Sequence, residues 1–147
     1  MKAVVMECRI RVCASEDRVR RFVENARRVV TDAIPVPVRY SIVVEPVDSV
    51  LLARQWAAAN RAAAGSKRSP GSFDVDVAFT GSGWLTPARL ESLSRDILAD
   101  VEADPGPGAE VVPWILTLTT SVDDVTRRRL ARVHPSLDLT ASVPISV

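Results

Sequence analysis

The sequence predicts an α+β protein: a ferredoxin-like sandwich with a five-stranded, mostly antiparallel sheet and helices on one face. Two observations lead to this prediction. Segments that alternate apolar and polar residues take turns along the chain with segments of helical periodicity, which gives five strands and four helices. The strands alternate apolar with charged residues, whereas strands covered on both faces are almost continuously apolar. A doubly wound parallel α/β sheet, which the element order alone also allows, is the alternative.

The composition is that of one domain with an aliphatic core. The 147 residues suit a single domain, residues 1–147, and 47% of them are hydrophobic while only 5% are aromatic. The mean hydropathy of +0.11 is high for a small soluble monomer. It favours a partner or a second subunit that covers apolar surface. Alternatively, Ala and Val raise the index without forming a patch.

The net charge of +1 gives no overall field that would attract nucleic acid or an acidic membrane. Lys2 and Lys67 are the only lysines, and this Arg bias with abundant Ala and Val is typical of a bacterial-type, high-GC coding sequence. No apolar run resembles a signal peptide or a membrane span, so a cytoplasmic protein is expected. Cys8 and Cys13 fall on opposite faces of one predicted strand, which argues against a disulfide between them.

Residues 1–13 form the first predicted strand, because apolar side chains occupy every second position. Its other face carries the charged residues Glu7, Arg9 and Arg11. Ser15 is expected to cap the helix that follows, and this helix must end before Pro35 because the residue preceding a proline is driven out of the helical region. The apolar stripe of that helix is Val19, Phe22, Val23, Ala26, Val29 and Val30.

Residues 36–45 alternate again and form the second predicted strand. Asp48 is expected to cap an Ala-rich helix over residues 49–64, which Gly65 would end. Residues 66–72 then combine glycine, proline and basic residues, and they predict a loop. This helix would connect two strand–helix–strand units.

The second unit begins with the strictest alternation in the chain, residues 73–80. A turn at residues 81–83 leads into a helix that Thr86 caps and Pro87 opens, since the missing N–H of proline has no intrahelical partner at the first helical position. Residues 110–120 form the fourth predicted strand, with Val112, Trp114, Leu116 and Leu118 on one face.

The last part of the chain would add a helix and a strand to these two units. Ser121 is expected to cap a short helix, with Asp124 as the reciprocal carboxylate of a capping box. His134 and Pro135 would close this helix. Residues 137–145 alternate to the chain end and predict a fifth strand at the edge of the sheet.

Asp74 and Asp76 stand two apart on one strand face, and a carboxylate pair can hold a divalent cation for phosphoryl transfer. The same face should also carry charges from neighbouring strands, namely Glu7, Arg9, Arg11 and Arg39. A solvated cross-strand ladder of opposite charges accounts for all of them. We therefore expect no metal site and no cofactor.

The candidate ligand-binding residues are Gly81, Ser82, Gly83 and Thr86, where backbone N–H groups at a helix N-terminus could hold an anion. The segment lacks the third glycine of a dinucleotide fingerprint and the Gly-Lys-Ser/Thr of a P-loop. A plain strand-to-helix turn is the simpler interpretation.

No catalytic constellation is apparent in the sequence, and we expect no catalytic residues. His134 is the only histidine, and beside a proline at a helix end it is expected to act as a cap. A general base would need a nucleophile and an orienting partner within reach.

The candidate partner-binding residues are Arg127, Arg128, Arg132, Val143 and Ile145. The arginines lie near a helix C-terminus without the interleaved aromatic residues that stack on bases, which argues against nucleic acid. The leading hypothesis is a non-catalytic interaction or assembly module that self-associates or joins a larger complex, with a sheet edge that pairs with a partner strand. The alternatives are a small anionic-ligand-binding regulatory domain and a metal-dependent phosphoryl-transfer enzyme.

Overall fold

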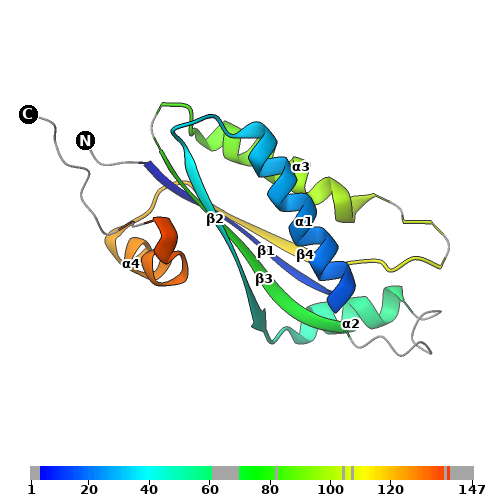
Figure 1. The fold of residues 1–147 in the computed structure, drawn as a ribbon. Coiled ribbons are helices and arrows are strands. Elements are labelled where there is room, and N and C mark those ends of the chain that lie inside the picture. Colours follow the sequence, from blue (N-terminus) through cyan, green and yellow to red (C-terminus); the bar gives the residue numbers. More distant parts are fainter. Residues whose placement is uncertain are drawn as a thin grey trace, which may run out of the picture.

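The computed structural model describes residues 4–60, 70–81, 83–103, 105–106, 108–137 and 139. In chain order the elements are β1 (Val4–Ser15), α1 (Glu16–Ala33), β2 (Arg39–Val47), α2 (Val50–Ala59), β3 (Pro70–Gly81), α3 (Pro87–Glu102), β4 (Trp114–Thr119), α4 (Asp124–Val133) and the short 3₁₀ helix η2 (Pro135–Leu137) (Figure 1). No helix in these segments is long and apolar enough to cross a bilayer.

The strands form one sheet with the order β2-β3-β1-β4, and every neighbouring pair is antiparallel. The α+β class is therefore confirmed, and the parallel alternative is not found. The expected fifth strand is wrong where the chain is described, because Pro135–Leu137 is a 3₁₀ helix. Residues 140–147, which include Val143 and Ile145, lie outside the described residues.

The apolar face of the sheet, called the inner face here, packs against α1 and α3 (Figure 1). The alternation predicted for residues 1–13 and 73–80 is correct from residue 4 on, since the expected apolar side chains of both central strands are buried, except Val4 and Phe73, which are partly buried. The largest fully buried side chains of this core include Phe22 of α1, Phe79 of β3 and Ile97 of α3. Aliphatic and aromatic burial on this face supplies the main driving force for folding.

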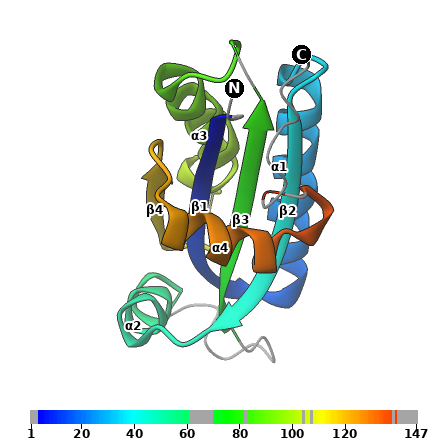
Figure 2. The same ribbon diagram turned by 90° about the vertical axis from the view of Figure 1, so that its left-hand side faces the viewer.

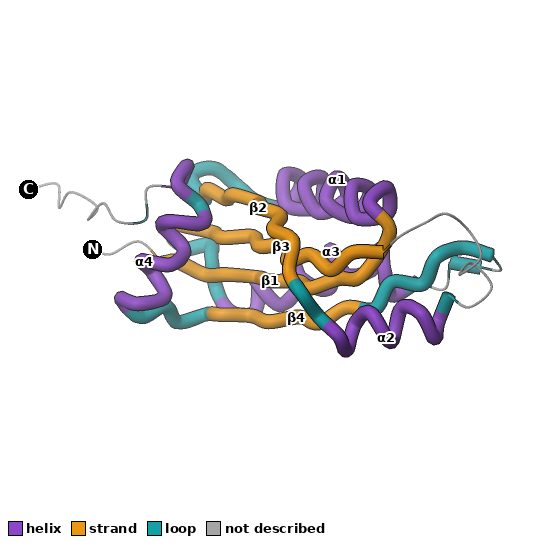
Figure 3. Tube along the Cα trace, turned by 90° about the horizontal axis from the view of Figure 1, so that it is seen from below, coloured by secondary structure: helices purple, strands orange, loops and turns teal. Residues whose placement is uncertain are grey.

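The sequence predicts helices on one face of the sheet only, which would leave the other face exposed to solvent. This prediction is wrong, because helices cover both faces of the sheet. Figures 2 and 3 show α4 crossing this outer face near one end while α2 lies near the other end. Leu130 of α4 is buried against Val5 and Ala78, and Leu52 and Trp56 of α2 pack on Cys13. The outer face thus has apolar contacts at both ends, with charged residues between them.

Two expected helix starts are corrected, and one is confirmed. Thr86 caps α3 as predicted, since its Oγ1 accepts a hydrogen bond from the Arg89 N–H at 3.3 Å. Ser49 rather than Asp48 caps α2, and this helix ends at Ala59, earlier than expected. In α4 the cap is Asp123 instead of Ser121. Each error displaces the cap by one or two residues within a run of residues able to cap.

The fourth strand starts at Trp114, because Glu110 has another role. The Glu110 carboxylate is buried and accepts hydrogen bonds from the Ser15 N–H at 2.7 Å, the Ser15 hydroxyl at 2.6 Å and the Trp56 indole N–H at 2.8 Å. Ser15 stands at the N-cap position of α1, but its hydroxyl makes no cap bond to the helix. A carboxylate at a helix N-terminus suits the positive end of the helix dipole. Glu110 therefore joins β1, α1 and α2 at a single point.

Candidate functional site

A cluster of polar side chains lies on the outer face beneath α4. We call it the outer-face cluster, and its members are Glu7, Arg9, Ser41, Asp76, Arg129 and His134. Glu7 and His134 are completely buried, and Asp76 is 5% exposed. Charged groups this deep in a protein are costly unless ion pairs and hydrogen bonds satisfy them. The cluster is the most concentrated chemistry in the described residues.

Strand register brings the members from the sheet together. Glu7 lies opposite Ala78, and Arg9 lies opposite Asp76, so the two carboxyl groups are diagonal neighbours on β1 and β3. Ser41 of β2 also lies opposite Ala78, on the other side of β3. Alanine at position 78 leaves room above the sheet for the side chains that come from α4.

α4 supplies the charge that compensates Glu7. The Arg129 guanidinium makes a bidentate pair with the Glu7 carboxylate, with N···O distances of 2.8 and 3.1 Å. Arg9 contributes a longer contact of 3.4 Å to Glu7 and another of 3.4 Å to Asp76. A bidentate arginine–carboxylate pair fixes orientation as well as charge. The pair therefore determines where α4 sits on the sheet.

His134 follows α4 directly and lies between two partners. Its Nε2 is 2.9 Å from Asp76 Oδ1, and its Nδ1 is 2.9 Å from Ser41 Oγ. An ionised Asp76 can only accept, which places the proton on Nε2 and leaves Nδ1 as the acceptor for the Ser41 hydroxyl. His134 stands at the C-cap position of α4, as expected. Each of its two ring nitrogens therefore has a side-chain partner, a hydroxyl on one side and a carboxylate on the other.

The carboxyl groups of Glu7 and Asp76 titrate as a pair. Burial raises the pKa of Asp76 to about 6; the hydrogen bond with His134 opposes this rise, and Glu7 adds to it. Burial also acts to raise the pKa of Glu7, but hydrogen bonds with Asp76 and Arg129 and the charge of Arg9 lower it to about 2. Between these two values the pair carries one negative charge in place of two.

We expect the stability of the protein to depend on this pair with opposite signs in two pH windows. From about pH 4 to pH 6 the folded state keeps a proton on Asp76 that the unfolded state, with a pKa near 3.8, has released. Raising the pH through this window therefore destabilises the fold, by roughly 1–3 kcal/mol. From about pH 2 to 4.5 Glu7 acts in the opposite direction, because there the unfolded state holds the extra proton.

Urea unfolding at pH 4, 5, 6 and 7, compared between the wild type and Asp76→Asn, isolates this effect, since Asn cannot titrate. The stability of the wild type relative to the variant should fall between pH 4 and pH 6. A constant difference over that range would contradict the buried pair. The charged groups that face Asp76 are Glu7 and Arg9 from β1 and Arg129 from α4, and the imidazole of His134 also contacts it.

Asp74 and Asp76, the candidate metal ligands, are both engaged by cationic or imidazole side chains. Arg11 binds Asp74 in a bidentate pair at 2.7 and 3.0 Å. Asp76 is held by Arg9 and His134. The cross-strand ladder expected from the sequence is present, although its members are more buried than a solvated ladder would be. In the described ranges no three His, Cys, Asp or Glu side chains gather closely enough to hold a metal ion.

The expected anion-binding residues lie at the turn between β3 and α3. Gly81 ends β3, Gly83 has a φ of +68°, and the Thr86 hydroxyl is already bound to the first turn of α3. Ser82 lies outside the described residues. The described part of this turn connects a strand to a helix, and Gly83 supplies its left-handed conformation.

The arginines proposed for partner binding have different surroundings. Arg127 donates to the Leu139 carbonyl at 3.3 Å, Arg128 donates to the Asp124 carbonyl at 3.2 Å, and Arg132 is exposed. Their neighbour Arg129, which the sequence did not single out, faces the sheet instead. Cys8 and Cys13 are buried free thiols on opposite faces of β1, as expected, and burial raises the pKa of Cys8 to about 12.

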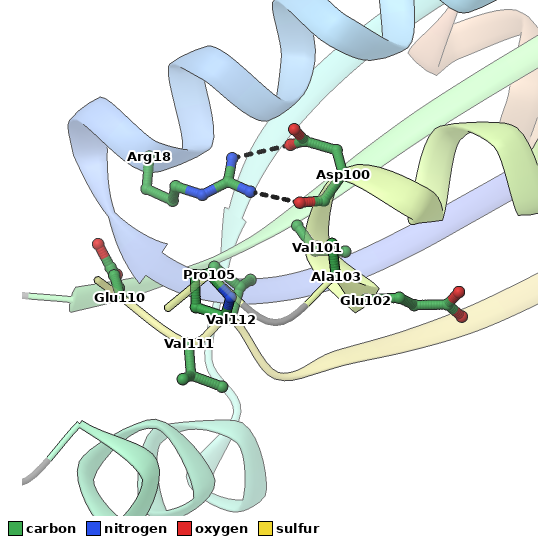
Figure 4. A pocket seen from close by; sticks show the side chains of 9 residues that line it. All are labelled: Arg18, Asp100, Val101, Glu102, Ala103, Pro105, Glu110, Val111 and Val112. Carbon is green, nitrogen blue, oxygen red and sulfur yellow. Dashed lines mark hydrogen bonds and ion pairs between the residues drawn. The ribbon is translucent and has the colours of Figure 1, made fainter. Parts of the chain in front are cut away.

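Described residues also line two surface hollows. One, of about 230 Å³, lies between the C-terminal end of α3 and the segment before β4, where Arg18 binds both the Asp100 carboxylate and its carbonyl (Figure 4). The other, of about 160 Å³, lies on the outer face and is lined by Arg9, Arg11, Ile115 and Thr117. The second hollow borders β4.

In the sheet that the described residues form, β4 is one edge, and Figure 2 shows none of the described strands beyond it. The Cys13 N–H donates to the Pro113 carbonyl at 3.2 Å, so Cys13 and Pro113 are a hydrogen-bonded pair of the antiparallel ladder between β1 and β4. Because such pairs alternate along an antiparallel ladder, the N–H and C=O groups of Trp114, Leu116 and Leu118 point away from β1. The strand carries no charged residue, and the side chain of Ile115 is 41% exposed. Within the described part of the chain, β4 therefore has no charged side chain that would oppose pairing with a further strand.

Comparison with known proteins adds no family. No family model and no curated protein matches the chain. An amidase of the hydantoinase/carbamoylase family from Burkholderia phymatum is similar over 94% of this chain and 35% of its own, with 12% identity and a TM-score of 0.47. An amidase of the same family from Burkholderia multivorans is similar over 89% of this chain and 33% of its own, with 13% identity and a TM-score of 0.41. The C-terminal domain of MgtC from Mycobacterium tuberculosis is similar over 81% of this chain and 95% of its own, with 12% identity and a TM-score of 0.39. The chain spans about a third of either amidase. These similarities assign no function.

Proposed function

We propose that this protein is an interaction and assembly module that associates through the open edge of β4. The supporting observation is the row of outward-pointing backbone groups at Trp114, Leu116 and Leu118 on a strand without charge. Such a row can accept an added strand through main-chain hydrogen bonds. The high mean hydropathy of the chain is in keeping with a covered surface.

The partner proposed for this edge is β4 of a second copy. Antiparallel pairing about a two-fold axis at Leu116 would set Trp114 opposite Leu118 of the partner subunit and Leu116 opposite its own counterpart. All three are the residues whose backbone groups face outward, so one register uses every available group. Two uncharged strands meet without like-charge repulsion. The other edge strand, β2, contains Arg39, Glu45 and Pro46, which disfavour pairing there.

The finer fold assignment proposed here is the ferredoxin-like sandwich. Its support is the strand order, in which β3 lies between β1 and β2 while β1 lies between β3 and β4. The two strand–helix–strand units are therefore interleaved, with α2 as the connection between them. α4 and η2 are additions on the outer face.

Light scattering coupled to size-exclusion chromatography tests the association. We expect the wild type to be a dimer and Ile115→Lys to raise the dimer dissociation constant at least about tenfold, which corresponds to ~1.4 kcal/mol. The reason is that two-fold pairing brings the lysines of both copies onto one sheet face, and charge on an edge strand opposes pairing.

Val125→Lys is the matched control. Val125 of α4 is also an exposed aliphatic residue, at 70%, but it contributes no backbone group to the β4 edge. This variant should dimerise like the wild type. A wild-type protein that stays monomeric at its highest soluble concentration would overturn the proposal, and so would equal effects of the two lysines.

A further inference from the structure

We propose that Ser41 is a nucleophile for acyl transfer from small carboxylic esters, with His134 as its general base and Asp76 as the residue that positions His134. This activity goes beyond the proposed assembly role and does not depend on it. If it is correct, the expectation of a non-catalytic module is incomplete.

Three separate parts of the chain converge to form this arrangement. Ser41 comes from the edge strand β2, Asp76 from the central strand β3, and His134 from the residue that follows α4. The imidazole contacts both partners at 2.9 Å and is completely buried, so its ring cannot turn to another partner without breaking two hydrogen bonds. A nucleophile bonded to a base, with the base oriented by a third group, is the recurring geometry of activated serines.

The protonation of the ring follows from its partners. With Asp76 ionised, Nε2 carries the proton, and its N–H donates a hydrogen bond to the Asp76 carboxylate. The lone pair of Nδ1 then faces the Ser41 hydroxyl. Ser41 is only partly buried at the edge of the sheet, whereas His134 behind it is shielded from water. Of the three residues, Ser41 is therefore the least buried and the one at which a small ester would bind.

The proposed step balances without an added oxidant or reductant. Ser41 Oγ forms a bond to the ester carbonyl carbon as its proton moves to His134 Nδ1. The tetrahedral intermediate then collapses, the bond from carbon to the alkoxide oxygen breaks, and the alkoxide leaves as an alcohol with that proton. Water releases the acyl group from Ser41 by the same proton route. Arg39 lies two residues earlier on the same face of β2, and its guanidinium donates to the Ser136 carbonyl at 2.7 Å.

A labelling experiment tests Ser41 directly. The full chain is incubated with p-nitrophenyl acetate and, separately, with an alkyl fluorophosphonate, and the adducts are located by intact mass and peptide mapping. We expect one adduct, on Ser41, that disappears in Ser41→Ala. Ser121→Ala, which removes an exposed serine elsewhere, should label like the wild type. No adduct with either reagent, or an adduct that persists in Ser41→Ala, would overturn the proposal.

Asp76→Asn separates a positioning role from a structural one. The Asn side-chain amide can donate to Nε2, which moves the ring proton to Nδ1 and removes the base from Ser41. Labelling should slow at least about 100-fold in a variant whose circular dichroism shows it folded. An unchanged labelling rate in this folded variant would contradict the assignment of Asp76.

Ser41→Cys gives a second measurement that leaves Asp76 intact. An isolated thiol, whose pKa is ~8.5, is mostly protonated at neutral pH. A thiol beside His134 should be alkylated by iodoacetamide about tenfold faster than free cysteine, because the thiolate is the reactive form. The native Cys8 and Cys13 are buried and should stay unmodified. Alkylation no faster than that of free cysteine would count against a base at His134.

Discussion

Glu7→Ala is expected to lower the free energy of unfolding by about 3–5 kcal/mol. The Glu7 side chain is 1% exposed and compensates Arg129 of α4, with Arg9 beside it. Removing one partner of such a buried pair leaves the other charge without compensation, which costs more than the pair contributes. Since the Arg129 side chain is 35% exposed and can regain some water, the lower end of the range is expected. Urea unfolding followed by circular dichroism measures the change.

Glu16→Ala is the control for that measurement. Glu16 makes an ion pair with Arg20 at 2.9 Å, but the two side chains are 80% and 69% exposed. Exposed pairs of this kind contribute little, and the change should stay within about 0.5 kcal/mol. Similar effects at Glu7 and Glu16 would mean that the outer face is solvated in solution.

Glu110→Ala is expected to cost about 2–4 kcal/mol, because three buried donors lose their acceptor together. Two of them belong to Ser15 at the start of α1, and the third is the indole N–H of Trp56 in α2. The substitution should also shift the Trp56 fluorescence, since the indole loses its hydrogen bond. Unfolding by urea with tryptophan emission as the signal reports both effects.

Glu110→Gln refines this test. Its amide oxygen can still accept, whereas its nitrogen cannot, so the loss of stability should fall between the wild type and Glu110→Ala. Glu102→Ala, at the exposed end of α3, should have little effect. A Glu110→Ala variant as stable as Glu102→Ala would contradict the junction described for β1, α1 and α2.

The inner layer of the fold could be predicted from the sequence because its signals are local. Period-two alternation in residues 73–80 fixed which side chains of β3 are buried, and Thr86 followed by Pro87 fixed the start of α3. Caps were less certain where several capping residues adjoin, as around Asp48 and Ser121. In these places the chain offers more than one acceptable start, and tertiary contacts select among them.

The outer layer could not be predicted in the same way. A charged residue at every second position fits a sheet face that is exposed to solvent. It fits equally well a face covered by a helix that carries opposite charges. α4 does this through Arg129, whose partner Glu7 is 122 residues away in sequence. No local period encodes such a pairing. A weak signal was present: β1 and β3 alternate opposite charges at the same register, and such pairs tolerate burial better than charges of one sign.

The candidate site was missed for a related reason. His134 was judged from its neighbours in sequence, a helix end and a proline, and these do account for its position at the end of α4. Its side chain meets Ser41 and Asp76 only because α4 lies across the sheet. The three residues are 35 and 58 positions apart along the chain, and nothing in their spacing identifies them as a group. Only the tertiary arrangement brings the hydroxyl, the imidazole and the carboxylate together.

α4 buries the outer-face cluster and holds His134 between Asp76 and Ser41. The chain has one histidine, so ¹⁵N-labelled protein gives a single, unambiguous pair of imidazole nitrogen signals. At pH 7 to 8 we predict one fixed tautomer, protonated at Nε2 and unprotonated at Nδ1, with a ring proton that exchanges slowly with water. Nitrogen signals averaged between the two tautomers, with fast exchange of the ring proton, would show that the imidazole is free in solvent and would contradict the account.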